Sequence, residues 1–386
     1  MSAAAERLAL GLADLERREL RRTRRVLDSP QGTRVRVEGR ALLNFSSNDY
    51  LGLANDARLR EAALRAVDEY GVGAGASPLV SGHLRVHHEA EERFAAFAAL
   101  PRALLFGSGY LANLGILAAL ADREAHVFSD ALNHACLIDG ARLSRAQVTV
   151  YPHRDLGALA EGLSTSKAPV RIVATDSVFS MDGDVAPVPQ LVELCERHDA
   201  WLVLDDAHGI GVLGATGHGT LEHFGLRSPR IVYMATLGKA LGGYGAFVAG
   251  EAQVVEWLVQ RARTYIYSTA LPPMAAAVAI RALELVGEDP SLLANLRLRI
   301  DELHAALRRI GFQGELTPTA IQPVILGAAG RALEASAKLA AQGFLVPAIR
   351  PPTVPEGTSR LRISLCAAHG EGDIEALAAA LAGHLP

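Results

Sequence analysis

The sequence predicts an α/β protein whose large domain is built on a mostly parallel sheet and whose C-terminal domain is smaller and α+β. Runs rich in β-branched residues recur between residues 103 and 250, and the later ones are separated by roughly thirty residues, as helical crossovers require. After about residue 285, two long amphipathic stretches flank short strands, which is typical of antiparallel pairing. We therefore divide the chain into an N-terminal helix with an edge hairpin (1–46), a large domain (47–285) and a small domain (286–386).

The composition is that of a globular protein, because 50% of the 386 residues are hydrophobic and 21% are charged. The net charge of −4 gives no reason to expect nucleic acid or an anionic membrane as a partner. No apolar run approaches the roughly 18 residues of a membrane span, and the N-terminus lacks a signal peptide's uninterrupted apolar stretch. The three cysteines are scattered, which fits a reducing compartment. We expect a cytoplasmic protein.

The expected elements can be assigned along the chain. Helical spacing of apolar and charged residues extends to about Arg25, and an alternating run at 33–39 favours an edge hairpin. In the large domain we expect strands at 103–106, 126–130, 147–151, 171–177, 201–206, 230–236 and 245–250, with helices at 110–120 and 133–143. In the small domain we expect strands at 322–327, 344–349 and 360–365.

Ligands of open α/β sheets bind beyond the carboxyl ends of the strands, so the residues that follow each strand are candidate site residues. After 103–106, Ser108, Gly109 and Tyr110 open a helix, whose first backbone amides are suited to a phosphate. The same stretch fits G-x-G-x-x-A, and Asp130 lies about twenty residues further on, as in a dinucleotide-binding unit. A nicotinamide-dependent dehydrogenase and a plain strand-to-helix turn are therefore alternatives here.

Two further strands are followed by histidine. His134 follows 126–130; its ring is suited to lie on a flat cofactor, and a capping role is the alternative. Asp205 ends the run 201–206 and His208 follows it; a carboxylate at a buried strand end is costly without a cationic partner. The chain contains no G-x-x-x-x-G-K-[ST] loop, and neither H-E-x-x-H nor a cysteine pair supports a metal. We predict no metal site.

A lysine follows the strand 230–236, in the stretch ATLGKALGG. Lys239 is one of only three lysines among 38 basic residues, the others being Lys167 and Lys338. Arginine holds a phosphate as well as lysine does, but only lysine loses its proton to become an amine nucleophile. The sequence therefore marks Lys239 as a candidate Schiff-base residue.

These strand-end residues together match the requirements of one cofactor. Pyridoxal phosphate (PLP) needs a lysine, an acid at its ring nitrogen, donors at its phenolic oxygen, a phosphate cradle and a flat group on its ring. No alternative interpretation uses all of these residues. We predict PLP as the cofactor.

The sequence also resembles a known family, the α-oxoamine synthases, from about residue 20 to the C-terminus. The resemblance is carried by FSSNDYLGL, FGSGYLAN, DSVFSMDGDVAP, VLDDAHGIGVLG, TLGKALG, IYSTALPP and AIRPPTVPEGTSRLRIS. It implies a PLP-dependent transferase of aspartate aminotransferase-like fold with a seven-stranded sheet, acting as a homodimer. Members join an amino acid to an acyl thioester with loss of CO2. IRPPTVP and TLGKALGGYGAF favour L-alanine and a pimeloyl thioester of coenzyme A or acyl carrier protein, as in biotin biosynthesis, over glycine and acetyl-CoA.

The resemblance also implies roles for individual residues. It makes Lys239 the Schiff-base lysine, places Asp205 at the ring nitrogen and stacks His134 on the ring. The other implied positions are His208 and Ser180 near the phenolic oxygen, Ser108, Gly109, Tyr110 and Thr236 at the phosphate, and Ser268 and Thr269 at the phosphate of the neighbouring subunit. Implied substrate-binding positions are Arg22 (with Arg21 and Arg24 close to it), Asn48, His134, Arg350 and Thr353. Pro78 departs from the family, since many relatives have arginine there.

Overall fold

The computed structural model describes residues 2–385. The chain forms two compact units. The larger unit comprises residues 49–180 and 184–294, and the smaller comprises the chain up to residue 48, residues 181–183 and the chain from residue 295 onwards. No helix within residues 2–385 is both long and apolar enough to cross a bilayer.

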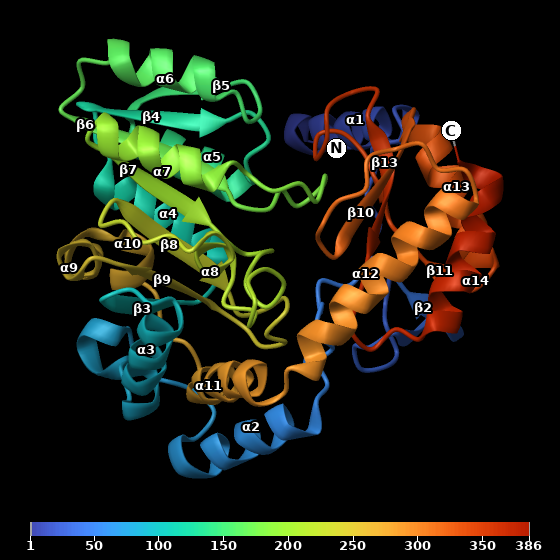
Figure 1. The fold of residues 1–386 in the computed structure, drawn as a ribbon, viewed down its shortest axis with the longest axis horizontal. Helices are drawn as coiled ribbons and strands as arrows, with labels where there is room; N and C mark the ends of the chain where they lie inside the picture. Colours follow the sequence, from blue (N-terminus) through green and yellow to red (C-terminus); the bar gives the residue numbers. More distant parts are fainter. Residues whose placement is uncertain (1, 386) are drawn as a thin grey trace. The chain divides into compact units, whose positions relative to one another are not determined.

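The larger unit is built on one seven-stranded sheet, with the strand order β3-β9-β8-β7-β6-β4-β5. Figure 1 shows the strands in this order, from the bottom to the top of the left-hand part of the picture. The strands are β3 (Arg102–Phe106), β4 (Ala125–Asp130), β5 (Gln147–Tyr151), β6 (Val170–Asp176), β7 (Ala200–Asp205), β8 (Ile231–Thr236) and β9 (Ala246–Gly250). Five of them run parallel, from β5 to β8, while β9 is antiparallel to both β8 and β3. The prediction of a mostly parallel seven-stranded sheet is confirmed.

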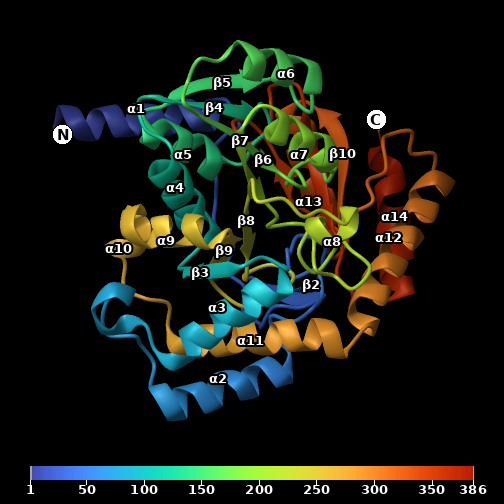
Figure 2. The same cartoon turned by 60° about the vertical axis from the view of Figure 1, so that its left-hand side comes forward.

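Helices cover this sheet because its central strands are apolar on both faces. Ile172, Val203 and Val232, from three neighbouring strands, are at most 1% exposed and share one hydrophobic cluster with Ile116 and Leu258 of the covering helices. Figures 1 and 2 both show α2 beside α11, and α4 packs on α5. The helices are α2 (Ala57–Tyr70), α3 (Arg85–Phe97), α4 (Gly109–Leu120), α5 (Ala135–Ser144), α6 (Leu156–Thr165), α7 (Val188–Arg197), α8 (Thr220–Phe224), α9 (Ala252–Arg261), α10 (Arg263–Ile266) and α11 (Pro273–Glu288), with a π turn at Pro78–Gly82.

The smaller unit contains two three-stranded sheets, β1-β2-β11 and β10-β13-β12. The strands are β1 (Arg34–Val37), β2 (Arg40–Asn44), β10 (Ile321–Gly327), β11 (Phe344–Leu345), β12 (Ala348–Ile349) and β13 (Ser359–Ser364). The helices are α1 (Ala3–Arg17), α12 (Ser291–Arg309), which begins in the larger unit, α13 (Ala329–Ala341) and α14 (Glu371–Leu381), followed by a short 3-10 turn (Ala382–His384). The pairing of β10 with β13 and of β12 with β13 is antiparallel.

Two expectations for this unit were wrong in detail. The strand expected at 344–349 is two strands: β11 pairs with β2, and β12 pairs with β13 of the other sheet. Pro347 lies between them and has no N–H for a continuous ladder. The N-terminal helix ends at Arg17 and does not extend to about Arg25, since Glu19 has a φ of +57°, in the left-handed region that a right-handed helix cannot contain.

His153 bridges two carboxylates near the carboxyl end of β4. Its Nδ1 lies 2.9 Å from Asp130 Oδ1, its Nε2 lies 3.0 Å from Asp184 Oδ2, and its ring packs edge-on against Phe179. Burial of the ring lowers the pKa of His153, but hydrogen bonds to the two carboxylates outweigh it and raise the pKa to about 9. The imidazolium therefore ties the end of β4 to the loop after β6.

We expect replacement of His153 by glutamine to destabilise the protein in a pH-dependent way. A pKa raised from its unfolded value contributes stability that is fully present below about pH 6.5 and is lost as the pH rises through about 9. The difference in free energy of unfolding between the wild type and His153→Gln should therefore be largest near about pH 6 and smallest near about pH 9.5. Urea denaturation at both pH values measures it, and a difference that does not change with pH would contradict the assignment.

Candidate active site

Lys239 lies in a short loop between β8 and β9 that is closed by backbone hydrogen bonds. Gly243 N donates to Leu237 O at 2.8 Å, and Gly242 N donates to Lys239 O at 2.9 Å. Gly242 has a φ of +64°, and a Cβ there would lie 2.5 Å from the backbone of Leu53. Only glycine fits this turn. The loop therefore holds the backbone of Lys239 in one position.

The Lys239 side chain meets His208. Its Nζ lies 2.8 Å from His208 Nε2, and the other ring nitrogen, Nδ1, lies 2.7 Å from the hydroxyl of Tyr50. His208 is only 5% exposed and follows the carboxyl end of β7. The imidazole is thus oriented from both sides, with one nitrogen directed at the lysine amine.

Asp205 ends β7 and is 3% exposed. Its Oδ2 accepts a hydrogen bond of 2.7 Å from Asn113 Nδ2, and its Oδ1 accepts one of 2.9 Å from Ala207 N. Cys136 Sγ lies 3.9 Å from Asp205 Oδ2. Neutral donors therefore fix the carboxylate, and no arginine or lysine within residues 2–385 forms a salt bridge with it.

His134 is the N-cap of α5, so the histidine does cap a helix, as the alternative interpretation held. Its Nδ1 accepts from Cys136 N at 3.3 Å, and its own backbone N–H donates to Asp176 Oδ2 at 2.7 Å. Desolvation of the imidazole lowers the pKa of His134. The charge of Asp205 opposes this shift, and the charge of Lys239 adds to it. The residue as a whole is exposed. The ring is therefore neutral at pH 7 and remains accessible from solvent.

The start of α4 and the end of β8 form a small polar cradle. Ser108 is the N-cap of α4, and Gly109 and Tyr110 are its first helical residues. A Cβ on Gly109 would lie 2.6 Å from Thr236 Cγ2, so glycine is needed for this approach. Within residues 2–385, the buried hydroxyl of Thr236 has no hydrogen-bond partner. An unpaired buried hydroxyl beside a helix N-terminus is suited to an anion.

Asp206, next to Asp205, has a different role. It is fully buried and accepts hydrogen bonds from the hydroxyls of Ser177, Thr220 and Tyr233, the last at 2.6 Å, and from Thr220 N at 2.9 Å. Desolvation raises the pKa of Asp206, and these donors oppose the increase. Its oxygens are occupied by the fold, so Asp206 is a structural residue.

The remaining predicted residues of the larger unit lie in loops. Ser180 lies in the turn that follows the bridge between Val178 and Val185. Ser268 and Thr269 follow α10 and line a small hollow together with Gly107, which precedes the cradle at the start of α4.

Three of the predicted substrate residues come together in the smaller unit. Arg22, Arg350 and Thr353 line a cavity of about 470 Å³, in which Arg22 Nη2 lies 3.4 Å from Thr353 Oγ1. Arg350 donates to the backbone carbonyl oxygens of Glu19 and Arg21. Asn48, also in this unit, does not line the cavity; its Oδ1 accepts a hydrogen bond of 3.1 Å from Arg362, which is 4% exposed.

Sequence reasoning missed four residues that contact predicted site residues, three in the larger unit and Arg362 in the smaller unit. Asn113 holds Asp205, Tyr50 holds His208, and Asp176 accepts from His134. Asn113 is a lone amide in the apolar helix GYLANLGILAAL, and Asp176 ends a strand in the same way as Asp205, so both left a signal in the sequence. Arg362 lies on the expected strand 360–365, and no pattern in the sequence marked it as a site residue.

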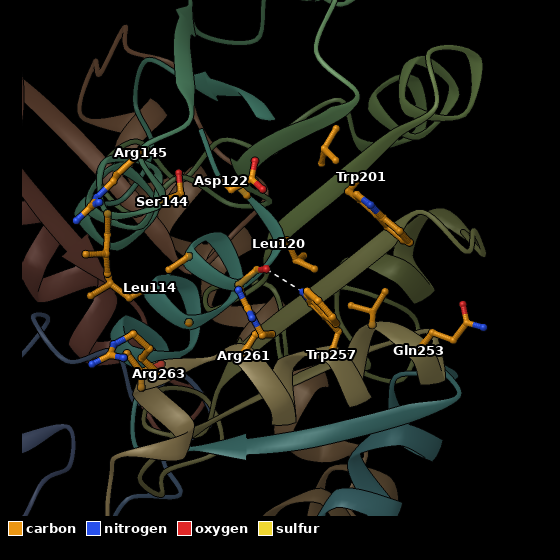
Figure 3. A pocket seen from close by; sticks show the side chains of 18 of the residues that line it. Leu114, Leu120, Asp122, Ser144, Arg145, Trp201, Gln253, Trp257, Arg261 and Arg263 are labelled. Carbon is orange, nitrogen blue, oxygen red and sulfur yellow. Dashed lines mark hydrogen bonds between the residues drawn. The ribbon is translucent and has the colours of Figure 1, made fainter. Parts of the chain in front are cut away.

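A large hollow lies at the other edge of the sheet. It has a volume of about 1100 Å³ and contacts Val170, Trp201 and Arg230, at or next to the amino ends of β6, β7 and β8. Figure 3 shows Trp257 at its wall, where the indole Nε1 donates to Ala119 O at 2.8 Å. Asp205 and Thr236 lie at the carboxyl ends of the same strands. The hollow is therefore separate from the candidate active site.

Known proteins resemble the chain over nearly its whole length. Residues 40–381 match the family Aminotransferase class I and II, so the chain belongs to this family. The chain is 52% identical over 379 residues to an 8-amino-7-oxononanoate synthase from Methylococcus capsulatus, with 98% of both chains covered, and 54% identical to one from Janthinobacterium sp., with 96% of this chain and 95% of the relative covered. Within the aminotransferase family, the chain is thus a member of the 8-amino-7-oxononanoate synthases.

Solved structures agree with this placement. Serine palmitoyltransferase from S. paucimobilis, in a complex with a PLP–myriocin adduct, superimposes with a TM-score of 0.92 at 27% identity and covers 100% of this chain and 98% of its own. The 8-amino-7-oxononanoate synthase of Francisella tularensis has a TM-score of 0.77 at 29% identity, covering 89% and 97%. The predicted PLP-dependent transferase fold is confirmed, and the dehydrogenase alternative is wrong.

The contrast between the two neighbouring aspartates gives a prediction. Replacing Tyr233 by phenylalanine removes one of the donors to the buried carboxylate of Asp206. We expect the free energy of unfolding to fall by about 1–3 kcal/mol, since a buried charged acceptor loses a hydrogen bond. Urea denaturation measures the loss. An unchanged stability would show that Asp206 does not depend on this donor.

Proposed function

We propose that the protein is a PLP-dependent acyltransferase that joins L-alanine to a pimeloyl thioester, releasing CO2 and the free thiol and forming 8-amino-7-oxononanoate for biotin biosynthesis. Its membership of the 8-amino-7-oxononanoate synthases supports this reaction. The observation that carries the proposal is the contact of Lys239 Nζ with His208 Nε2. Lys239 follows β8, and His208 follows β7, the strand that ends with the buried Asp205. We expect the enzyme to act in the cytoplasm.

The residues of the site fit PLP. The unpaired hydroxyl of Thr236 and the helix start at Gly109 and Tyr110 are suited to its phosphate. Lys239 supplies the amine for its aldehyde, and the carboxylate of Asp205 is suited to a protonated ring nitrogen. His134 offers an accessible ring, and His208 and Ser180 are proposed at the phenolic oxygen. When bound, PLP supplies an aldehyde that condenses with amines and a ring that takes up negative charge from Cα.

The chain's own contribution begins with Asp205. Its carboxylate is oriented by Asn113 and is buried, so its attraction for a ring N–H is little screened by water. A carboxylate in this place keeps a proton on the ring nitrogen. The donors around Asp205 are neutral, so its carboxylate could still pair with a cationic ring N–H of PLP. The donors around Asp206 already occupy its oxygens.

Lys239 then moves a proton. With PLP and alanine bound, the amine at Lys239 Nζ would accept the Cα proton as a general base. The fixed loop backbone keeps the amine near that position, and His208 lies within hydrogen-bond distance of it. Arginine in this place would remain protonated and transfer no proton.

The alanine carboxylate is proposed to bind an arginine of the smaller unit. Arg350 is the arginine that the family resemblance indicates, with Arg22 and Thr353 beside it in the same cavity. Arg362 is a second candidate because it is buried and already bonded to Asn48, an expected substrate position. A guanidinium binds a carboxylate through two parallel hydrogen bonds, which a lysine cannot form. Replacing the arginine that binds the alanine carboxylate, Arg350 or Arg362, by lysine should therefore raise the KM for alanine.

A homodimer is part of the proposal. Ser268 and Thr269 line a hollow with Gly107, which directly precedes the N-cap of α4, and in the proposed dimer they would approach the phosphate of the neighbouring subunit. The active site is then complete only in the dimer.

Product identification tests the proposed function. Purified protein with PLP is incubated with L-alanine plus pimeloyl-CoA or the pimeloyl carrier-protein thioester, and separately with glycine plus acetyl-CoA. Mass spectrometry should find 8-amino-7-oxononanoate as the main product. Faster turnover of glycine with acetyl-CoA would instead assign the protein to the alternative substrates.

The Asp205→Asn variant should bind cofactor but lose activity. The amide keeps the shape and a hydrogen bond to Asn113, but it removes the charge that holds the ring proton. We expect kcat to fall by about 100-fold or more. The matched control is Asp206→Asn, which should lower stability while its folded fraction keeps kcat. Equal losses of kcat in both variants would contradict the assigned role of Asp205.

A further inference from the structure

In contrast to the prediction from the sequence, we propose that His83, His88 and Glu91 form a binding site for a transition-metal cation of the Zn²⁺ class at the start of α3. The test of this site does not depend on the proposed reaction. Two imidazoles and a carboxylate are the nitrogen and oxygen ligands that such cations bind.

The three side chains converge on one point. His88 and Glu91 are three residues apart on α3 and therefore lie on one helix face, and His83 lies just after the π turn Pro78–Gly82, before the helix begins. The possible ligand atoms all lie within 4.8 Å of one another, and His83 Nε2 is 3.8 Å from Glu91 Oε2. Ligands at about 2.0–2.2 Å in a tetrahedron are about 3.4 Å apart. Small rotamer changes therefore suffice to close the site.

The surrounding structure orients these ligands. Glu91 Oε1 accepts a hydrogen bond of 3.0 Å from Leu105 N, which leaves Oε2 on the side of His83. His87, between the two ligand histidines, uses both ring nitrogens elsewhere: Nδ1 accepts from Leu84 N at 3.0 Å, and Nε2 lies 2.6 Å from Leu271 O. His87 is therefore a positioning residue that fixes the helix start, as partners of ligand residues commonly do.

The turn before the helix is also rigid. A Cβ on Gly82 would lie 2.1 Å from Ala76 O, so the backbone is tightly packed immediately before His83. A pre-formed backbone lowers the entropy lost on binding, because the ligands need little ordering.

The position suggests what the ion does. His83, His87 and Glu91 line the hollow that also contains Ser268 and Thr269, and His87 is bonded to the backbone of Leu271 in the same loop. An ion at His83, His88 and Glu91 would tie the start of α3 to the π turn beside this loop. The exposure of His83 and His88 leaves room for a water as fourth ligand. We therefore assign the ion a structural role.

The site is tested by Co²⁺ and Zn²⁺ binding to the untagged holoenzyme after chelator treatment. We expect one Co²⁺ per chain to give visible d–d absorption that Zn²⁺ displaces, and Zn²⁺ to raise the midpoint of thermal unfolding. Each of His83→Ala, His88→Ala and Glu91→Gln should weaken binding by about 10-fold or more. Glu92→Gln is the matched control: Glu92 contacts His88 at 3.3 Å but lies outside the cluster, and binding should be unchanged.

Two results would overturn the proposal. One is the absence of saturable Co²⁺ or Zn²⁺ binding by the wild type. The other is equal binding by the wild type and the three ligand variants, which would place the ion on the cofactor or on a cysteine instead.

Discussion

Burial of negative charge at the carboxyl edge of the sheet is the constraint on which the candidate site depends. Asp176 and Asp205 end neighbouring strands, Asp206 follows, and each is at most 3% exposed. A buried carboxylate costs several kcal/mol unless it is paired or hydrogen-bonded. Asp206 is satisfied by hydroxyl and amide donors, and Asp176 accepts from His134 while burial and Asp205 raise its pKa. Asp205 accepts from the neutral donors Asn113 and Ala207, and we propose that the protonated ring nitrogen of PLP supplies its cationic partner.

The distribution of lysine follows from the same chemistry. Lys167 and Lys338 are exposed, and Lys338 pairs with Glu334 on its own helix, where arginine would serve equally well. Lys239 differs because its loop has a fixed backbone and its amine meets a buried imidazole. Glu91 is a further carboxylate of low exposure, and two histidines lie near it. Our two proposals assign a bound partner to each of these places.

The sequence was informative where local pattern determines structure. Strand spacing predicted the parallel sheet. The residues after strand ends singled out Lys239, His208 and Asp205 as candidates, since parallel strands end at one edge, and the structure brings Lys239 and His208 into contact. Partners from distant parts of the chain could not be predicted from spacing: Tyr50, which lies in a turn, contacts His208 from 158 residues away. The strand expected at 344–349 was divided by Pro347 between two sheets, a choice of partner that only tertiary structure settles.

The central claim is that Lys239 alone carries the cofactor, and the scarcity of lysine makes this directly measurable. Holoenzyme is reduced with borohydride, digested and analysed by peptide mass spectrometry, with Lys239→Ala as the control. The account predicts the pyridoxyl phosphate mass on the peptide containing Lys239, none on those containing Lys167 or Lys338, and no labelled peptide from the variant. Label on either of the other two lysines, or an unaltered label in Lys239→Ala, would contradict it.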